Sequence, residues 1–213
     1  QQARHVRYGG WHLPDAAFPS LFETRVGLVG LGTIGRLLLD LLRPFHARVK
    51  VYDPYLPAGA LDAFPEAESA GLEEVLAWGD VISIHASLTR ETRGLLDARR
   101  LALIRDGALL VNTARGPIIA EDALIAELRA GRIQAVLDVY THEPLAADSP
   151  LRALDSVTAL PHSAGTTARG IEMTYAMLDE IARFARGEPL QCEISLEKCR
   201  LMTQQRDFDI YTG

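Results

Sequence analysis

A glycine-rich turn between an apolar run and a helical pattern constrains this chain more than any other feature. Gly30, Gly32 and Gly35 form a Gly-x-Gly-x-x-Gly pattern. The first glycine permits a tight turn, the second lets the backbone approach a ligand without a Cβ in the way, and the third lets the helix pack closely on the strand. A helix that begins near Thr33 and Ile34 would direct free N–H groups and the positive end of its dipole at an anion. The pattern is typical of a strand, turn and helix that bind a dinucleotide.

The next apolar run, residues 48–52, ends at an acidic side chain, Asp53. A carboxylate at this distance from the glycines can accept hydrogen bonds from the hydroxyls of an adenosine ribose. It would repel a 2′-phosphate, and the following Pro54 and Tyr55 supply no compensating positive charge. Three glycines can also be ordinary turn residues, but the strand, the helix and the acid together favour a cofactor site. The sequence therefore predicts NAD as the cofactor.

Composition bounds the remaining possibilities. With 213 residues and 48% hydrophobic content, the chain can bury the core of one large domain. A formal net charge of −6 argues against a nucleic-acid partner or an anionic membrane surface, and no apolar run has the length of a membrane span. Cys192 and Cys199 match neither redox spacing nor a zinc site, so we expect free thiols, no metal and a cytoplasmic location.

Apolar runs that suit buried strands alternate with segments of helical periodicity along the chain. The runs suit a parallel sheet that is covered on both faces. This alternation predicts an α/β fold, a Rossmann-type doubly wound parallel sheet with its ligand crevice beyond the carboxyl ends of the strands. The expected strands are 26–29, 49–52, 81–85, 108–112, 135–139 and 157–160, and the expected helices are 34–42, 72–78, 97–104, 121–130 and 167–186.

Polar side chains follow the last three expected strands. Arg115 follows the fourth, Asp138 and Glu143 come with the fifth, and His162 follows the sixth. The ends of parallel strands share one rim, so these side chains should converge. A guanidinium can hold a carboxylate through two parallel hydrogen bonds, an imidazole can transfer an alcohol proton, and a neighbouring carboxylate can orient the ring. This combination suits the interconversion of a 2-oxo acid and a 2-hydroxy acid.

The chain resembles a known family over about residues 24–187. The resemblance lies in Val-Gly-Leu-Val-Gly-Leu-Gly-Thr-Ile-Gly at 26–35, in Asp80 to His85 followed by Leu-Thr-Arg-Glu-Thr, in 107–116, in Leu-Asp-Val at 137–139 with Glu143-Pro144, and in Pro161-His162 followed by Gly165. These motifs are similar to the nucleotide-binding domain of the D-isomer-specific 2-hydroxyacid dehydrogenases. That family includes D-3-phosphoglycerate dehydrogenase, glyoxylate/hydroxypyruvate reductase, D-lactate dehydrogenase and the CtBP corepressors.

The resemblance implies roles for individual residues. Arg115 would bind and polarise the substrate, His162 would be the acid/base, and Glu143 would pair with His162. His142 is the alternative base. For His85 a structural role and a cofactor contact have equal weight. Asp138 would hold the nicotinamide carboxamide, and Thr113 and Ala114 would lie beside the nicotinamide. The residues expected to contact NAD are Gly30, Gly32, Thr33, Ile34, Gly35, Asp53, His85, Thr113, Ala114, Arg115, Asp138, His162 and Gly165.

The resemblance also implies a domain organisation, because the family's enzymes have two domains. We expect residues 1–24 to be the remnant of an interdomain connection, 25–187 the NAD-binding domain, and 188–213 a segment that returns to a substrate domain missing from a truncated fragment. A naturally compact protein is the alternative. The expected activity is NAD-dependent oxidation and reduction of a small 2-hydroxy or 2-oxo acid. A non-enzymatic NAD-sensing corepressor and an unrelated Rossmann enzyme are the other hypotheses. A homodimer could form through 95–96 and 101–104 or through the loop 145–154.

Overall fold

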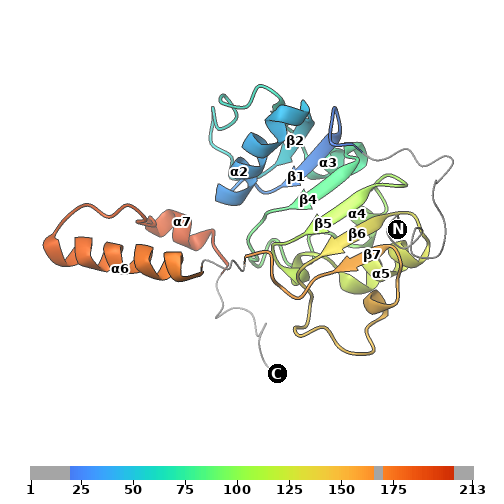
Figure 1. The fold of residues 1–213 in the computed structure, drawn as a ribbon. Coiled ribbons are helices and arrows are strands. Elements are labelled where there is room, and N and C mark those ends of the chain that lie inside the picture. Colours follow the sequence, from blue (N-terminus) through green and yellow to red (C-terminus); the bar gives the residue numbers. More distant parts are fainter. Residues whose placement is uncertain (1–19, 166–169, 204–213) are drawn as a thin grey trace, which may run out of the picture.

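One parallel sheet forms the body of the protein (Figure 1). The computed structural model describes residues 20–165 and 170–203. Within them, seven strands lie in the order β3-β2-β1-β4-β5-β6-β7, and every neighbouring pair is parallel. The strands are β1 (Arg25–Val29), β2 (Arg48–Tyr52), β3 (Ala67–Ser69), β4 (Val81–Ile84), β5 (Leu109–Asn112), β6 (Gln134–Leu137) and β7 (Val157–Ala159). This is the predicted doubly wound α/β fold.

The order in which the chain adds strands to the sheet reverses after β3. β1 pairs with β2 on one side and with β4 on the other. Successive strands move outward from β1 to β3, and the chain then crosses back to β4. Because crossovers between parallel strands are right-handed, the helices on the two halves pack against opposite faces of the sheet. The segments that leave the carboxyl ends of β1 and β4 lead to helices on opposite faces, and doubly wound sheets bind their ligands in the crevice at this switch point.

Helices pack on the sheet through two separate cores. The smaller core joins Leu39 and Leu42 to Val49 and Val51 of β2, and the larger core lies under the helices that follow β3 to β5. The helical elements are α2 (Thr33–Leu42), η1 (Arg43–Phe45), α3 (Leu72–Trp78), α4 (Ala98–Leu101), η2 (Gly116–Ile118), α5 (Glu121–Arg129), η3 (Pro150–Arg152), α6 (Gly170–Arg186) and α7 (Leu196–Arg200). No described helix is long and apolar enough to cross a membrane.

Two elements differ from the expectation. The short edge strand β3 lacks an apolar run and was not predicted, and it forms by pairing with β2. The expected helix over 97–104 is a single turn, α4, whose N-cap Asp97 accepts a hydrogen bond from the Arg100 N–H at 2.8 Å. The helix expected from residue 167 is described from Gly170, and residues 167–169 lie outside the described residues.

Some side chains of the two regions that we expected to contribute to a dimer surface lie in the protein's own core, whereas Leu95, Leu103, Leu145 and Leu154 are only partly buried, so the dimer surface stays a prediction. Leu96, Leu101, Ile104 and Leu151 are at most 1% exposed. The spacing of these side chains suits a buried helix face as well as an interface, and in this chain they pack inside.

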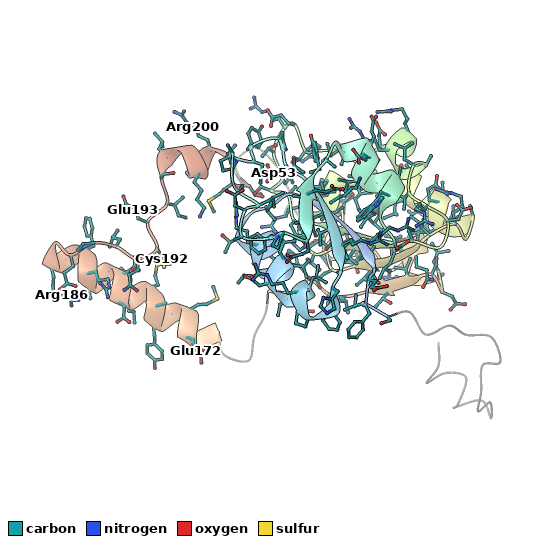
Figure 2. The ribbon with its side chains drawn as sticks, turned by 90° about the horizontal axis from the view of Figure 1, so that it is seen from above. Asp53, Glu172, Arg186, Cys192, Glu193 and Arg200 are labelled. Atoms are coloured by element: carbon teal, nitrogen blue, oxygen red, sulfur yellow. The ribbon has the colours of Figure 1, made fainter. Side chains whose placement is uncertain are left out.

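α6 extends away from the body formed by the sheet and its helices, and α7 follows it (Figures 1 and 2). Large apolar side chains on α6 are exposed, among them Met173, Met177 and Phe184. Cys192, labelled in Figure 2, follows α6, and Cys199 lies on α7; both are exposed.

Candidate functional site

The glycine-rich turn connects β1 to α2 at the switch point. Gly30 has a φ of +95°, and a Cβ there would lie 2.7 Å from the Ala86 backbone nitrogen, so only glycine fits. Gly32 differs, because a Cβ on it would meet no protein atom within 4 Å. Gly32 is also the N-cap of α2, with no side chain capping the free N–H groups of the first turn. An exposed, uncapped helix start with open space in front of it fits a pyrophosphate.

Asp53 lies directly beside this turn. Its Oδ2 accepts a hydrogen bond from the Leu31 N–H at 2.8 Å, and its Oδ1 accepts one from the Tyr55 N–H at 2.9 Å. The carboxylate therefore joins the end of β2 to the glycine-rich turn. Each oxygen keeps a further lone pair for a ribose hydroxyl, so the geometry fits the predicted cofactor contact.

His85 follows β4 against the other side of the turn. Its Nε2 lies 2.9 Å from Ser83 Oγ, and burial lowers the pKa of the imidazole below its usual value of 6.5. Its carbonyl carbon would be 2.8 Å from a Cβ at Gly30. The His85 backbone thus packs against the turn, and the burial of its ring favours the neutral form.

Arg115 lies in a loop that Asn112, the last residue of β5, holds in place. The Asn112 side chain donates to the Arg115 carbonyl at 3.0 Å and accepts from the Ala114 N–H at 3.0 Å. The Arg115 guanidinium donates to the Ala114 carbonyl at 2.6 Å. At Gly116, a Cβ would lie 2.0 Å from the carbonyl carbon and oxygen of Tyr140, so the Arg115 loop is pressed onto the loop after β6.

Asp138 anchors the turn that carries His162. The Asp138 carboxylate is fully buried, and its two oxygens accept from the Ser163 and Ala164 N–H groups at 2.8 and 2.9 Å. His162 has a φ of +52°, a left-handed conformation that costs a non-glycine residue about 1 kcal/mol. That conformation lets the two following N–H groups converge on one carboxylate, which offsets the burial of its charge.

His162 and Glu143 form a direct pair. The imidazole Nδ1 lies 2.6 Å from Glu143 Oε2, and Glu143 Oε1 accepts from the Tyr140 N–H at 3.0 Å. The side chain of Glu143 is 12% exposed, whereas that of His162 is 36% exposed. The carboxylate is thus fixed in place, and the ring that it orients remains accessible to a substrate.

The proposed catalytic residues follow neighbouring strands at one edge of the sheet, and three further residues hold their loops in place. Arg115, Glu143 and His162 follow the carboxyl ends of β5, β6 and β7. The sequence indicated no role in the site for Asn112, Tyr140 or Glu121. Glu121 Oε2 accepts a hydrogen bond from the Thr141 N–H at 2.9 Å. An asparagine at a strand end can form such a side-chain turn, which was a usable signal for Asn112 alone. The remaining predicted contacts, Thr113 and Gly165, are half-buried and exposed, respectively.

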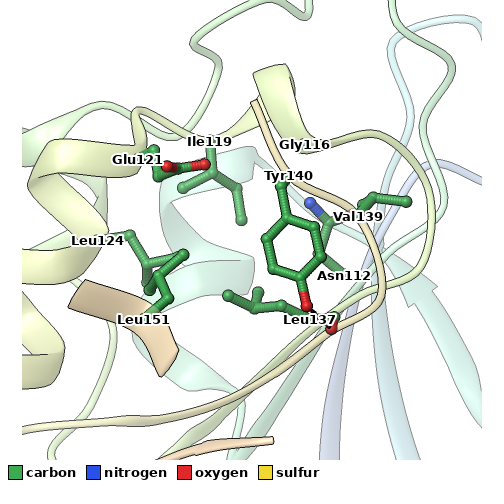
Figure 3. A pocket seen from close by; sticks show the side chains of 9 residues that line it. All are labelled: Asn112, Gly116, Ile119, Glu121, Leu124, Leu137, Val139, Tyr140 and Leu151. Carbon is green, nitrogen blue, oxygen red and sulfur yellow. Dashed lines mark hydrogen bonds between the residues drawn. The ribbon is translucent and has the colours of Figure 1, made fainter. Parts of the chain in front are cut away.

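A small cavity lies beneath this rim, and it is not a ligand site. Its lining includes Asn112, Glu121, Leu137 and Tyr140 (Figure 3). The space of about 10 Å³ accommodates no more than one water molecule. Among the described residues there is no cluster of His, Cys, Asp and Glu that could hold a metal ion.

Comparison with known proteins agrees with this geometry. Residues 1–164 match the family model of the D-isomer specific 2-hydroxyacid dehydrogenase, NAD binding domain. A crystal structure of a D-isomer specific 2-hydroxyacid dehydrogenase from Xanthobacter autotrophicus, in complex with NADPH and MES, superposes with a TM-score of 0.75 at 34% identity. The match covers 91% of this chain and 78% of that one.

Two curated relatives are metabolic enzymes by name. Glyoxylate reductase from Thermofilum pendens is 36% identical over 183 residues, which are 84% of this chain and 53% of that protein. D-3-phosphoglycerate dehydrogenase from Mycobacterium leprae is 38% identical over 176 residues, which are 82% of this chain and 33% of that protein. The chain therefore spans between a third and about half of the length of these relatives. Their names do not favour the corepressor alternative.

Proposed function

Because the chain belongs to the D-isomer-specific 2-hydroxyacid dehydrogenase family, we propose that it carries the NAD site and the acid–base pair of an oxidoreductase acting on a 2-oxo or 2-hydroxy acid. The observation that carries this proposal is the contact of 2.6 Å between His162 Nδ1 and Glu143 Oε2, on the same edge of the sheet as the glycine-rich turn. The exposed ring of His162 can exchange a proton with a substrate that lies next to the cofactor.

The cofactor site uses the turn, the start of α2 and Asp53. Gly32 leaves space for the pyrophosphate, Thr33 and Ile34 expose the first turn of α2, and Asp53 receives the ribose hydroxyls. Asp53 also disfavours a 2′-phosphate by charge repulsion, so we propose a preference for NAD over NADP. The contact of Asp138 with the nicotinamide carboxamide stays a prediction, because the carboxylate is fully buried and its two oxygens accept from the backbone after His162.

Bound NADH supplies the hydride, and the chain's own residues bind the acid and move the proton. An ionised carboxylate only accepts hydrogen bonds, so Glu143 keeps a proton on His162 Nδ1 and leaves Nε2 to face the substrate. In reduction, Nε2–H donates its proton to the oxygen of the carbonyl group. In oxidation, the same nitrogen, now without its proton, accepts the proton of the alcohol.

Arg115 binds the substrate carboxylate. One of its N–H groups donates to the Ala114 carbonyl, and the guanidinium has five donors, so a pair of parallel N–H groups remains for the acid. Asn112 fixes the backbone beneath this side chain. We also propose that residues 25–187 form the nucleotide-binding domain, while the homodimer and the cytoplasmic location stay predictions.

The test is turnover by the protein that carries this sequence. Loss of NADH absorbance is followed with glyoxylate, hydroxypyruvate, pyruvate and other small 2-oxo acids, and in parallel with NADPH. We expect at least one acid to be reduced, with a higher kcat/KM for NADH than for NADPH. Tight NADH binding without turnover of any 2-oxo or 2-hydroxy acid would contradict the enzymatic proposal, and a preference for NADPH would contradict the role of Asp53.

A further inference from the structure

Tyr140 contacts the segments of all three proposed catalytic side chains, although it faces the protein interior. It is only 4% exposed, and its ring belongs to the larger core. In Figure 3 the hydroxyl end of the ring points toward Leu137. A residue in this position cannot touch a substrate, so any effect on the reaction must act through its neighbours.

The hydroxyl joins the ends of two strands. It lies 3.0 Å from the Leu137 carbonyl, at the end of β6, and 2.8 Å from the Leu160 carbonyl, just after β7. A hydroxyl has one proton, and the Leu137 carbonyl already accepts from the Leu160 N–H at 2.8 Å. The shorter contact, to Leu160, therefore fixes a carbonyl that lies two residues before His162. Burial raises the pKa of the Tyr140 phenol, which keeps the donor protonated.

The backbone of the same residue reaches the other two segments. The Tyr140 N–H donates to Glu143 Oε1 at 3.0 Å, which holds the carboxylate whose other oxygen contacts His162. The Tyr140 carbonyl lies so close to Gly116 that no Cβ fits between them, which places the neighbouring Arg115.

We propose that Tyr140 is a positioning residue, whose hydroxyl sets the approach of the His162 turn to Glu143. This inference rests on the proposed function for its kinetic consequence, but its geometric content stands without it. The competing explanation is that Tyr140 is a core residue whose hydroxyl contributes to stability alone.

The variant that separates the two explanations is Tyr140→Phe, which keeps the ring and removes only the hydroxyl. One neutral hydrogen bond is removed, so we expect kcat to fall about three- to tenfold. KM for NADH should stay unchanged, because the glycine-rich turn is not affected. The control is Tyr175→Phe on α6, where the side chain is 60% exposed, and this variant should match the wild type.

A double-mutant cycle shows whether the hydroxyl acts through the imidazole. If it does, Tyr140→Phe should cause no further loss of kcat in a His162→Ala background. A full additional loss in that background would overturn the proposal, and so would a lower melting temperature with unchanged kcat.

A spectroscopic measurement on the chain itself distinguishes failure of this inference from failure of the proposed function. The Nδ1 proton between His162 and Glu143 should give a downfield, slowly exchanging NMR signal. We expect Tyr140→Phe to shift this signal or speed its exchange, and Tyr175→Phe to leave it unchanged. If no 2-oxo acid is turned over but the signal depends on Tyr140, the proposed function fails and the positioning role stands. A signal that is identical in wild type and Tyr140→Phe overturns the positioning role, whatever the activity.

Discussion

A methyl group added at Gly32 should impair cofactor binding without affecting the fold. Gly32 is the N-cap of α2, has an extended backbone with a φ of −77°, and would place a Cβ in open space. Gly71 provides a matched control, because it is the N-cap of α3, has a φ of −67°, and is equally open. Neither helix start has a side-chain cap, so Gly32→Ala and Gly71→Ala are the same change in the same local structure.

The expected magnitudes follow from this match. Alanine is a poorer N-cap than glycine, but it also lowers the entropy of the unfolded chain, and the two effects largely cancel. Both variants should therefore remain within about 0.5 kcal/mol of the wild type in free energy of unfolding, or about 2 °C in melting temperature. At Gly32 alone, the methyl group would displace a phosphate from a backbone N–H. A hydrogen bond to a charged group contributes about 1.5–3 kcal/mol, so the Kd for NADH should rise about 10- to 150-fold.

The assay pairs calorimetric titration with NADH and thermal melting without it. Gly71→Ala should bind NADH as the wild type does. Equal weakening in both variants would show a general effect of the helix start, and wild-type affinity in Gly32→Ala would refute the placement of the pyrophosphate at this turn.

Three further predictions concern the rim. Gly116→Ala should force the backbone away from Tyr140 and cost about 3 kcal/mol, which lowers the melting temperature by roughly 6–12 °C; a shift no larger than that of a variant at an open glycine would show that the close approach is unimportant. Because burial lowers the pKa of His85, the unfolded chain binds its proton first, and the free energy of unfolding should decrease as the pH falls below 6.5. In His85→Gln this decrease, followed by urea unfolding at several pH values, should be shallower, and an unchanged slope would argue against His85 as its source. Arg115→Lys should raise KM for the acid and lower kcat together in steady-state assays, because a point charge replaces a fork of donors; unchanged kinetics would exclude Arg115 as the carboxylate binder.

The sheet could be predicted from the sequence because its strands are local apolar runs. Each run that was expected to be a strand is one, with boundaries that differ by one or two residues. β3 could not be found in this way, because Ala67, Glu68 and Ser69 carry no apolar pattern and become a strand only by pairing with β2. The positions of Leu96 and Leu101 in the core were also not predictable, since a periodic apolar face does not show what covers it.

The sequence could name candidate site residues where they follow strands and have a carboxylate, guanidinium or imidazole group. Arg115, Glu143 and His162 met both conditions, and the fold places them on one rim. Tyr140 met only the first condition, because it follows β6 but has none of these groups. Its contribution depends on hydrogen bonds to carbonyls at residues 137 and 160 and on close approach to Gly116. Such contacts arise from tertiary packing, so nothing in the local sequence marks them.

The structure adds a second role to the one that the sequence predicts for Asp138. Its place after β6 predicted a cofactor contact, which stays a prediction. The structure adds two hydrogen bonds from the backbone after His162, so the side chain also supports the turn that carries the imidazole. That support requires the left-handed conformation of His162, which no sequence pattern indicates.

The most direct test of the proposed chemistry compares two neighbouring histidines. His142 is exposed and lies next to Glu143 in the sequence, whereas His162 contacts the Glu143 carboxylate. In the protein that carries this chain, His162→Ala should lower kcat by about 10²–10⁴-fold, the usual contribution of a general acid, while NADH is still bound. His142→Ala should retain wild-type turnover. Near-full activity in His162→Ala, or an equal loss in His142→Ala, would contradict the assignment of His162 as the proton donor.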